Sequence, residues 1–496
     1  MQEIIVGLYI LSLTALFIFA LPTSFLMLYN KLFKKKNFII KCENNPDKEV
    51  TIQLPVFNEF YVVERLIDAV CAIEYPQNLL EIQILDDSTD ETKELIDKIA
   101  VRKISDGFDI KILRRKKRIG FKGGALREGL KTAKGEFIAI FDADFIPKKD
   151  FLKKTISYFT DPLTGVVQTR WEHLNEDFSL LTKIQAAVLD NHFAVDQLQK
   201  YKAGLFINFN GTAGVWRKKT ILDAGNWQDD TLTEDLDLSY RAQLKGWRFL
   251  YLDNIGSPAE LPIEINAVKS QQFRWTKGAV ETSKKLLPEI WKAHISFRKK
   301  IFAIFHLNSN FVFPIIILLS ILNLPLLIIK NAGVFSNVFN LMSVFLTVFF
   351  LTFIIYFSTQ KKFYLDWKRR IKYFPAYLAG TMGLSINNSK AVMEALFNFK
   401  SEFIRTPKFR VVEKSTGYFS KKYLTENKFN ITTLLEITLA LYCTAGVALA
   451  LYLSDYASLP VQILFAVSFS GVSYFSIRSK GESKIRGKKK YESGIK

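Results

Sequence analysis

The stretch GEFIAIFDAD, residues 135–144, places a short apolar run directly before two aspartates. Residues 137–141 have the length and composition of a buried β-strand, and Asp142 and Asp144 follow at its carboxyl end. Open α/β sheets bind ligands at the carboxyl ends of their strands, and carboxylate oxygens suit Mg²⁺ or Mn²⁺ bridging a diphosphate. An isolated Asp-x-Asp is also typical of a solvated turn, so the neighbouring segments decide between these interpretations.

Short β-type runs alternate with helical patterns on either side of this strand. Further strands are predicted at residues 50–56, 81–85 and 108–113, and a helix at residues 126–133. Asn58 is expected to cap a helix whose apolar face carries Val62, Leu66, Ile67 and Val70. Gly123-Gly124 is expected to form a plain turn, since no full phosphate-loop pattern surrounds it. The alternation predicts a parallel sheet wrapped by helices, with a second acidic pair, Asp86-Asp87, at a strand end.

Apolar and charged residues are segregated along the chain of 496 residues, which is 49% hydrophobic yet carries 68 Lys and Arg. Five apolar blocks are long enough to span a membrane, at residues 4–28, 301–329, 338–357, 432–453 and 460–475. Cations gather on alternate links between them, which predicts an outside amino terminus and a cytosolic domain between the first two spans. Residues 373–396 are apolar but interrupted by polar residues, so an interfacial amphipathic helix is expected there.

The formal charge of +20 is compatible with a nucleic-acid partner or a membrane surface. No basic stripe is interleaved with aromatic residues, and many cations flank the apolar blocks, so the lipid membrane is the expected partner and nucleic acid is not. The 3 cysteines lie far apart, which indicates neither a disulfide framework nor a metal cluster.

Five motifs follow one another between residues 50 and 285 of the sequence. They are Leu54-Pro55-Val56-Phe57-Asn58-Glu59, Asp86-Asp87, Asp142-Ala143-Asp144, Thr233-Glu234-Asp235 and Gln271-Gln272-Phe273-Arg274-Trp275. The ordered set resembles the processive family 2 glycosyltransferases, which include cellulose, hyaluronan and mannan synthases. Residues 168–171 and 209–217 look like the cellulose-synthase-like glucomannan and xyloglucan-backbone enzymes. Gln272 stands where the cellulose synthases usually have Arg, which leaves the polymer open.

The resemblance implies a GT-A-type α/β fold, with a mixed sheet and helices on both faces, joined to an α-helical transmembrane domain. The expected domains are an anchor at 1–30, a cytosolic glycosyltransferase domain at 31–300, helix pairs at 301–358 and 431–477, a cytosolic or interfacial segment at 359–430, and a basic cytosolic tail at 478–496.

The resemblance also implies a role for each matching residue. Asp235 is the expected general base, with Glu234 beside it in the catalytic site. The expected nucleotide-sugar site comprises Asn58, Glu59, Asp86, Asp87, Lys122 and Asp142, and the acceptor and diphosphate site comprises Gln271, Gln272, Arg274 and Trp275. Asp142 and Asp144 are expected to hold Mg²⁺ or Mn²⁺. A helix cap is the structural alternative for Asp235, because Thr231 and Thr233 precede a helical run.

The implied activity is inverting transfer of a hexose from UDP-glucose or GDP-mannose to a growing β-linked glycan, coupled to export. The expected location is a bacterial inner membrane with the catalytic domain in the cytosol. A transferase that adds a single sugar to a membrane lipid shares the donor chemistry and stays open as an alternative. A transporter or noncatalytic scaffold is the other alternative, although the sequence shows no internal repeat and keeps every expected carboxylate.

Overall fold

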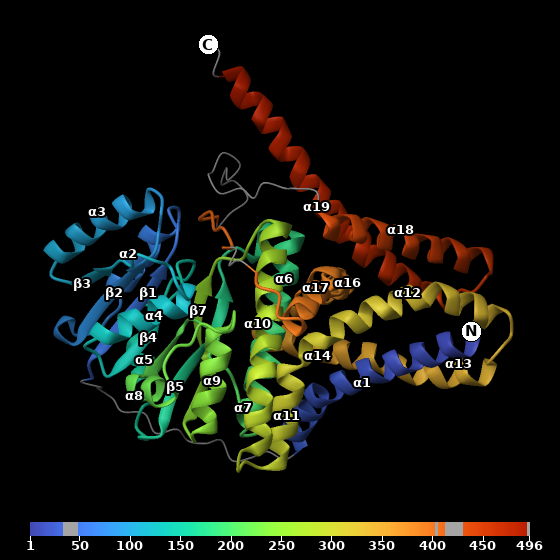
Figure 1. Ribbon diagram of the computed structural model, residues 1–496, viewed down its shortest axis with the longest axis horizontal. Helices are drawn as coiled ribbons and strands as arrows, with labels where there is room; N and C mark the ends of the chain where they lie inside the picture. Colours follow the sequence, from blue (N-terminus) through green and yellow to red (C-terminus); the bar gives the residue numbers. More distant parts are fainter. Residues whose placement is uncertain (33–47, 402–404, 412–429, 494–496) are drawn as a thin grey trace.

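The computed structural model describes residues 1–32, 48–401, 405–411 and 430–493, with side chains described up to residue 478 in the last helix. It places a sheet domain beside a bundle of long helices, with the long helix α10 (Ile265–Lys292) between them (Figure 1). Most of the expected basic tail, residues 478–496, lies outside the part of the chain whose side chains are described.

A seven-stranded mixed sheet forms the centre of the first domain, in the order β3-β2-β1-β4-β6-β5-β7. The strands are β1 (Val50–Val56), β2 (Leu80–Asp86), β3 (Asp109–Leu113), β4 (Phe137–Ile140), β5 (Thr164–His173), β6 (Gly214–Arg217) and β7 (Arg248–Ala259). The first four are parallel, and β6 runs antiparallel to both β4 and β5. The four expected strands are present as β1 to β4. The mixed sheet implied by the resemblance is confirmed, whereas the local alternation pattern predicted a parallel sheet and did not indicate the antiparallel β6.

Helices cover both faces of this sheet because successive strand residues point to opposite sides. In β4, Phe137 and Ala139 belong to one buried cluster, and Ile138 and Ile140 belong to the other. The first cluster includes α2 (Val63–Cys71), α3 (Thr92–Ser105) and α5 (Phe151–Ile156). The second includes α4 (Phe121–Thr132), α8 (Lys218–Asp223) and α9 (Glu234–Leu244).

Two local expectations near the sheet were wrong. Asn58 does not cap α2, which begins at Val63 without a side-chain cap. Asn58 instead has a φ of 56°, and its Oδ1 accepts a hydrogen bond from the backbone N–H of Thr89 at 2.8 Å. Gly123 and Gly124 lie in the first turn of α4 and not in a turn between elements, because the left-handed Gly120 already makes the bend before the helix.

Five helices within the described residues are long and apolar enough to cross a membrane. Their ranges are Gln2–Leu32, Ser309–Asn331, Ser336–Phe363, Ile431–Tyr452 and Leu459–Arg478. They correspond to α1 (Gln2–Leu32), α12 (Val312–Asn331), α13 (Ser336–Met342) continued by α14 (Thr347–Phe363), α18 (Ile431–Tyr452) and the first part of α19 (Leu459–Ser493). They lie together on the side of α10 away from the sheet (Figure 1). The chain thus has the features of a membrane protein.

Shorter helices follow α10 and separate the third span from the fourth. The second span begins at Ser309 and not at Ile301, because α11 (Phe297–Leu307) is a separate helix that packs on α10. Residues 373–396 form α16 (Phe374–Gly383) and α17 (Ser385–Leu396), of 10 and 12 residues. At about 1.5 Å per residue, neither reaches across a hydrocarbon core of about 30 Å.

The remaining helices of the first domain are α6 (Leu180–Asn191), a π-helix (His192–Gln197) and α7 (Leu198–Lys202).

Candidate active site

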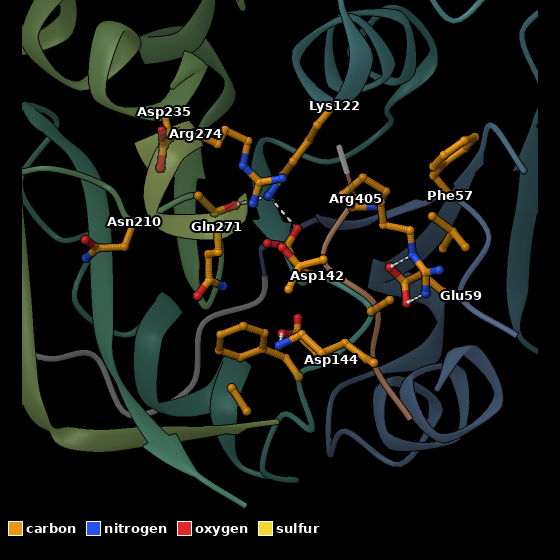
Figure 2. A pocket seen from close by; sticks show the side chains of 18 of the residues that line it. Phe57, Glu59, Lys122, Asp142, Asp144, Asn210, Asp235, Gln271, Arg274 and Arg405 are labelled. Carbon is orange, nitrogen blue, oxygen red and sulfur yellow. Dashed lines mark hydrogen bonds and ion pairs between the residues drawn. The ribbon is translucent and has the colours of Figure 1, made fainter. Parts of the chain in front are cut away.

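A cavity of about 210 Å³ opens at the carboxyl ends of β1 and β4, between the sheet and α10. Its wall contains ten of the residues expected at the site: Glu59, Asp87, Lys122, Asp142, Asp144, Glu234, Asp235, Gln271, Arg274 and Trp275. Figure 2 shows Lys122 and Arg274 reaching toward Asp142 from one side, with Arg405 and Glu59 on the other. Residues from seven separate stretches of the chain, Arg405 included, thus meet in one cavity.

Three residues expected at the site do not line this cavity. The Asn58 side chain is hydrogen bonded to Thr89 at the surface. Asp86 is 1% exposed and pairs with Arg114, whose Nε lies 2.7 Å from Asp86 Oδ2. Gln272 lines a different, apolar cavity on the membrane side of α10. The structure therefore assigns Asp87, and not Asp86, to the cavity wall.

Asp142 and Lys122 form an ion pair at the centre of the cavity. Lys122 Nζ also donates to the carbonyl of Gly211 at 2.9 Å, and the Asp142 backbone N–H donates to Thr212 Oγ1 at 2.9 Å. Burial raises the pKa of Asp142, and the positive charge of Lys122 opposes that shift. The lysine thus favours the charged form of a carboxylate that is partly exposed.

Asp144 lies beside Asp142 and has a different cationic partner. Lys408 Nζ is 2.5 Å from Asp144 Oδ2, and the lysine side chain is only 6% exposed. No group of three or more His, Cys, Asp or Glu suited to a metal occurs among the described residues. Asp142 and Asp144 would therefore supply two hard oxygen donors, and a diphosphate and water would supply the rest.

Glu234 and Asp235 stand in the first turn of α9. Asp235 does not cap the helix: Thr233 is the N-cap residue, and Asp235 Oδ1 accepts from the N–H of Leu236 at 2.9 Å. Burial, followed by the adjacent charge of Glu234, raises the pKa of Asp235 to about 7, while Lys122 opposes the shift. A carboxylate with a pKa near neutrality suits proton transfer at physiological pH.

The backbone beside Asp235 depends on glycine. Gly211 has a φ of +78°, and a Cβ at this position would lie 3.0 Å from Asp235 Oδ2 and 3.4 Å from Lys122 Nζ. A side chain would therefore strain the backbone and fill the space between Asp235 and Lys122.

The α10 helix forms the wall opposite the sheet. Burial lowers the pKa of Arg274, and the negative charges of Glu234 and Asp142 oppose that shift. Trp275 lies near Trp171, with 6.4 Å between ring centroids. The guanidinium suits an anionic leaving group, and the indole face suits a sugar ring.

A short segment from the membrane domain, residues 405–411, completes the cavity and was not expected from the sequence. Arg405 makes a bidentate ion pair with Glu59, with Nε–Oε1 and Nη2–Oε2 distances of 2.8 and 2.6 Å. Lys408 reaches Asp144, and the Phe409 N–H donates to Glu260 Oε1 at 2.9 Å. In the sequence, Arg405 and Lys408 are two cations within a polar stretch. This pattern is so common that it does not indicate a contact with the site.

Histidines beside the cavity were also missed. His192, on the π-helix, lies 2.9 Å from Asn210 through Nε2 and Oδ1, and Asn210 lines the cavity. Asn210 Nδ2 is buried without a hydrogen-bond partner among the described residues. His173 lines the same cavity and pairs with the buried Asp190 at 3.1 Å. These histidines stand singly in the sequence and lack the spacing of metal ligands, so the sequence did not indicate that they belong to the site.

Family models match most of the sheet domain and part of the membrane domain. The model for glycosyl transferase family 2 matches residues 51–221, and that for glycosyl transferase family group 2 matches residues 137–381. Glucomannan 4-beta-mannosyltransferase 2 of Arabidopsis thaliana is 42% identical over 262 residues, covering 52% of this chain and 49% of the relative. Probable glucomannan 4-beta-mannosyltransferase 4 of Oryza sativa subsp. japonica is 44% identical over 270 residues, covering 53% and 48%. The chain thus spans about half the length of these curated relatives.

A solved structure shares the fold. The mannosyltransferase PcManGT from Pyrobaculum calidifontis, in complex with GDP-Man and Mn2+, superposes with a TM-score of 0.57 at 17% identity, covering 80% of this chain and 100% of that one. This likeness, together with the mixed sheet, confirms the expected GT-A-type fold. The two family models overlap and together extend from residue 51 to residue 381, through every motif that forms the cavity. The chain belongs to glycosyltransferase family 2.

Proposed function

We propose that the protein transfers hexose from a nucleotide sugar to a growing β-linked glycan, with inversion at the anomeric carbon. The observation that carries this proposal is the placement of Asp235, with a pKa of about 7, in the same cavity as Asp142 and Asp144. The first carboxylate suits a general base, and the other two suit a divalent cation bound to a diphosphate.

Asp235 accepts the proton of an acceptor hydroxyl as that oxygen attacks the anomeric carbon. The bond between the anomeric carbon and the diphosphate oxygen breaks in the same displacement, so an α-linked donor gives a β-linked product. Arg274 and Lys122 lie where they can offset charge on the departing diphosphate. Trp275 positions the acceptor sugar through its ring face. Mg²⁺ or Mn²⁺ held by Asp142 and Asp144 would supply further charge neutralisation at the diphosphate.

GDP-mannose is the donor that we propose, with UDP-glucose as the alternative. The named plant relatives are 4-beta-mannosyltransferases at 42% and 44% identity, and PcManGT was solved with GDP-Man. The Mn2+ in the PcManGT complex supports a divalent cation, Mg²⁺ or Mn²⁺, as the partner of the donor.

A second cavity, of about 240 Å³, supports both a coupling to export and a lipid acceptor. Gln271 and Trp275 line this cavity as well as the catalytic one, and its other walls come largely from α6, α16 and α19. Gln271 and Trp275 thus lie between the catalytic cavity and the membrane helices, which supports an exit for the glycan on this side. Its lining is mostly aliphatic, which also fits the chain of a lipid acceptor.

We further propose that the five spans anchor the enzyme in a membrane with the catalytic domain on the cytosolic side. The cations that follow the first and third spans support this orientation. The relatives named above are plant proteins, so the bacterial inner membrane expected from the sequence finds no support.

The test is an assay of the full chain in lipid nanodiscs with radiolabelled GDP-mannose or UDP-glucose, each with Mg²⁺ or Mn²⁺. We expect long polymer from GDP-mannose, degraded by an endo-β-mannanase and lost with Asp235→Asn. Asp235→Asn keeps the shape of the side chain but removes the base, so donor binding should persist. A single labelled lipid would support the lipid transferase instead. No turnover of either donor would contradict the proposal.

A further inference from the structure

A third cavity, of about 260 Å³, lies at the end of the third span, apart from the catalytic site. Its charged and amide lining comes from the turn before α6, from α6, from α14 and from the short helical segments that follow α14: Glu176, Lys183, Gln360, Asp366, Arg369, Arg370 and Lys372. The short segments are α15 (Trp367–Arg370) and a 3₁₀ turn (Ile371–Tyr373). The motifs of glycosyl transfer do not include any of these residues.

The charges of this cavity leave a positive excess. Arg370 forms ion pairs with both acidic residues of the cavity. It pairs with Glu176, and its Nε lies 3.0 Å from Asp366 Oδ1. Arg369 and Lys372 make no ion pair within the described residues, although both line the cavity. Two cations are thus available to an anion that enters.

Gln360 gives an independent indication of a ligand. Its side chain is 1% exposed, and Nε2 has no hydrogen-bond partner among the described residues. A buried donor without an acceptor costs free energy, which an anionic oxygen in the cavity would recover. The amide and the two cations therefore favour the same kind of ligand.

The surroundings place this cavity at the headgroup layer of the proposed membrane. Gln360 lies in the last turn of α14, which ends at Phe363. Lys361 and Lys368 lie 5.8 and 5.7 Å from the ring of Trp367. Lys372 lies 5.1 Å from the ring of Tyr373. Aromatic rings mixed with cations at the end of a span are typical of the boundary between lipid and cytosol.

We propose that this cavity binds the phosphate of an anionic phospholipid, with Arg369 and Lys372 neutralising its charge and Gln360 Nε2 donating to a phosphate oxygen. A soluble phosphate has the same chemistry. The position at the end of a span favours the lipid, because a headgroup is held at this depth while its acyl chains lie beside α14.

The test uses the full chain in phosphatidylcholine to which phosphatidylglycerol is added. Native mass spectrometry then counts the phosphatidylglycerol molecules bound to each protein molecule. Arg369→Gln with Lys372→Gln is expected to weaken binding at the site about 30-fold, on the basis of about fivefold for each cation near a membrane surface. The matched control is Lys361→Gln with Lys368→Gln, which removes the same charge next to Trp367 without altering the cavity lining. The control should retain the bound lipid. Equal losses in the two variants would overturn the proposal, because they would indicate general attraction to an anionic surface.

A second variant and a second ligand separate the remaining explanations. Gln360→Met keeps the net charge and is expected to weaken binding about tenfold, so binding like that of the unaltered protein would overturn the proposal. Inorganic phosphate and glycerol phosphate are then added as competitors. We expect neither to displace phosphatidylglycerol, and displacement by low concentrations of either would assign the site to a soluble phosphate instead of a lipid.

Discussion

Lys408 is expected to compete with a divalent cation for Asp144. Its Nζ lies 2.5 Å from Asp144 Oδ2, so a cation that binds this oxygen must displace the lysine. Lys408→Met keeps the length of the apolar stem and removes the charge. The variant should therefore bind Mn²⁺ more tightly than the unaltered protein when no nucleotide is present.

The size of the effect follows from the strength of the ion pair. Two opposite unit charges about 4 Å apart attract each other by roughly 4 kcal/mol at an effective dielectric constant of 20. The side chains of Lys408 and Asp144 are 6% and 18% exposed, so solvation lost on pairing offsets part of this attraction. We expect a net effect of about 1–3 kcal/mol, which corresponds to an affinity increase of about 5- to 150-fold.

Free Mn²⁺ can be followed by electron paramagnetic resonance while the ion is titrated into nucleotide-free protein at constant ionic strength. Lys148→Met is the control for net charge, because Lys148 pairs at 2.8 Å with the partly exposed Glu172 outside the cavity. Adding Asp144→Asn to Lys408→Met should abolish the gain. Unchanged or weaker Mn²⁺ binding in Lys408→Met would refute the competition, and an equal gain in Lys148→Met would reduce it to a long-range charge effect.

Three further predictions concern the base, its backbone and the membrane interface. Because Asp235 has a pKa raised to about 7 and must be deprotonated to act, kcat/KM should fall about tenfold per pH unit below 7, and a flat acidic limb would contradict its role. Gly211→Ala should lower kcat at least about tenfold while the melting temperature falls only slightly, since its Cβ would lie 3.0 Å from Asp235 Oδ2. Glu436→Gln should destabilise the fold by roughly 3–5 kcal/mol in thermal unfolding, because it removes the carboxylate that neutralises the buried Lys269 at 2.7 Å. Lys269→Met combined with Glu436→Leu should recover most of that loss.

Local sequence predicted four of the seven strands, β1 to β4, and the acidic residues at the ends of β2 and β4. Each strand is a short apolar run that ends at polar residues, so β1, β2, β3 and β4 were placed within a residue or two of their observed bounds. The direction of β6 was not predictable in this way. Its direction depends on the path of the chain after β5, through α6, the π-helix and α7, and that path has no local signature.

Residues that act through distant partners were harder to place. Asp86 and Asp87 are adjacent in sequence and both acidic, yet only Asp87 lines the cavity, because β2 turns Asp86 toward Arg114. Arg405 contacts Glu59 across 346 positions of the chain. Such contacts depend on how the membrane domain packs on the sheet domain, and no periodicity or spacing within either segment encodes that packing.

The catalytic cavity holds its charges largely in pairs before any ligand binds. The pairs are Lys122 with Asp142, Lys408 with Asp144, and Arg405 with Glu59. A divalent cation that enters alone meets carboxylates that already have partners, and a diphosphate that enters alone meets cations that already have theirs. When both enter together, the carboxylates can move to the metal and the cations to the phosphates, so no buried charge is left unpaired. The arrangement therefore favours binding of metal and donor as one unit, and in the proposed mechanism Asp235, outside these pairs, stays available to take the acceptor's proton.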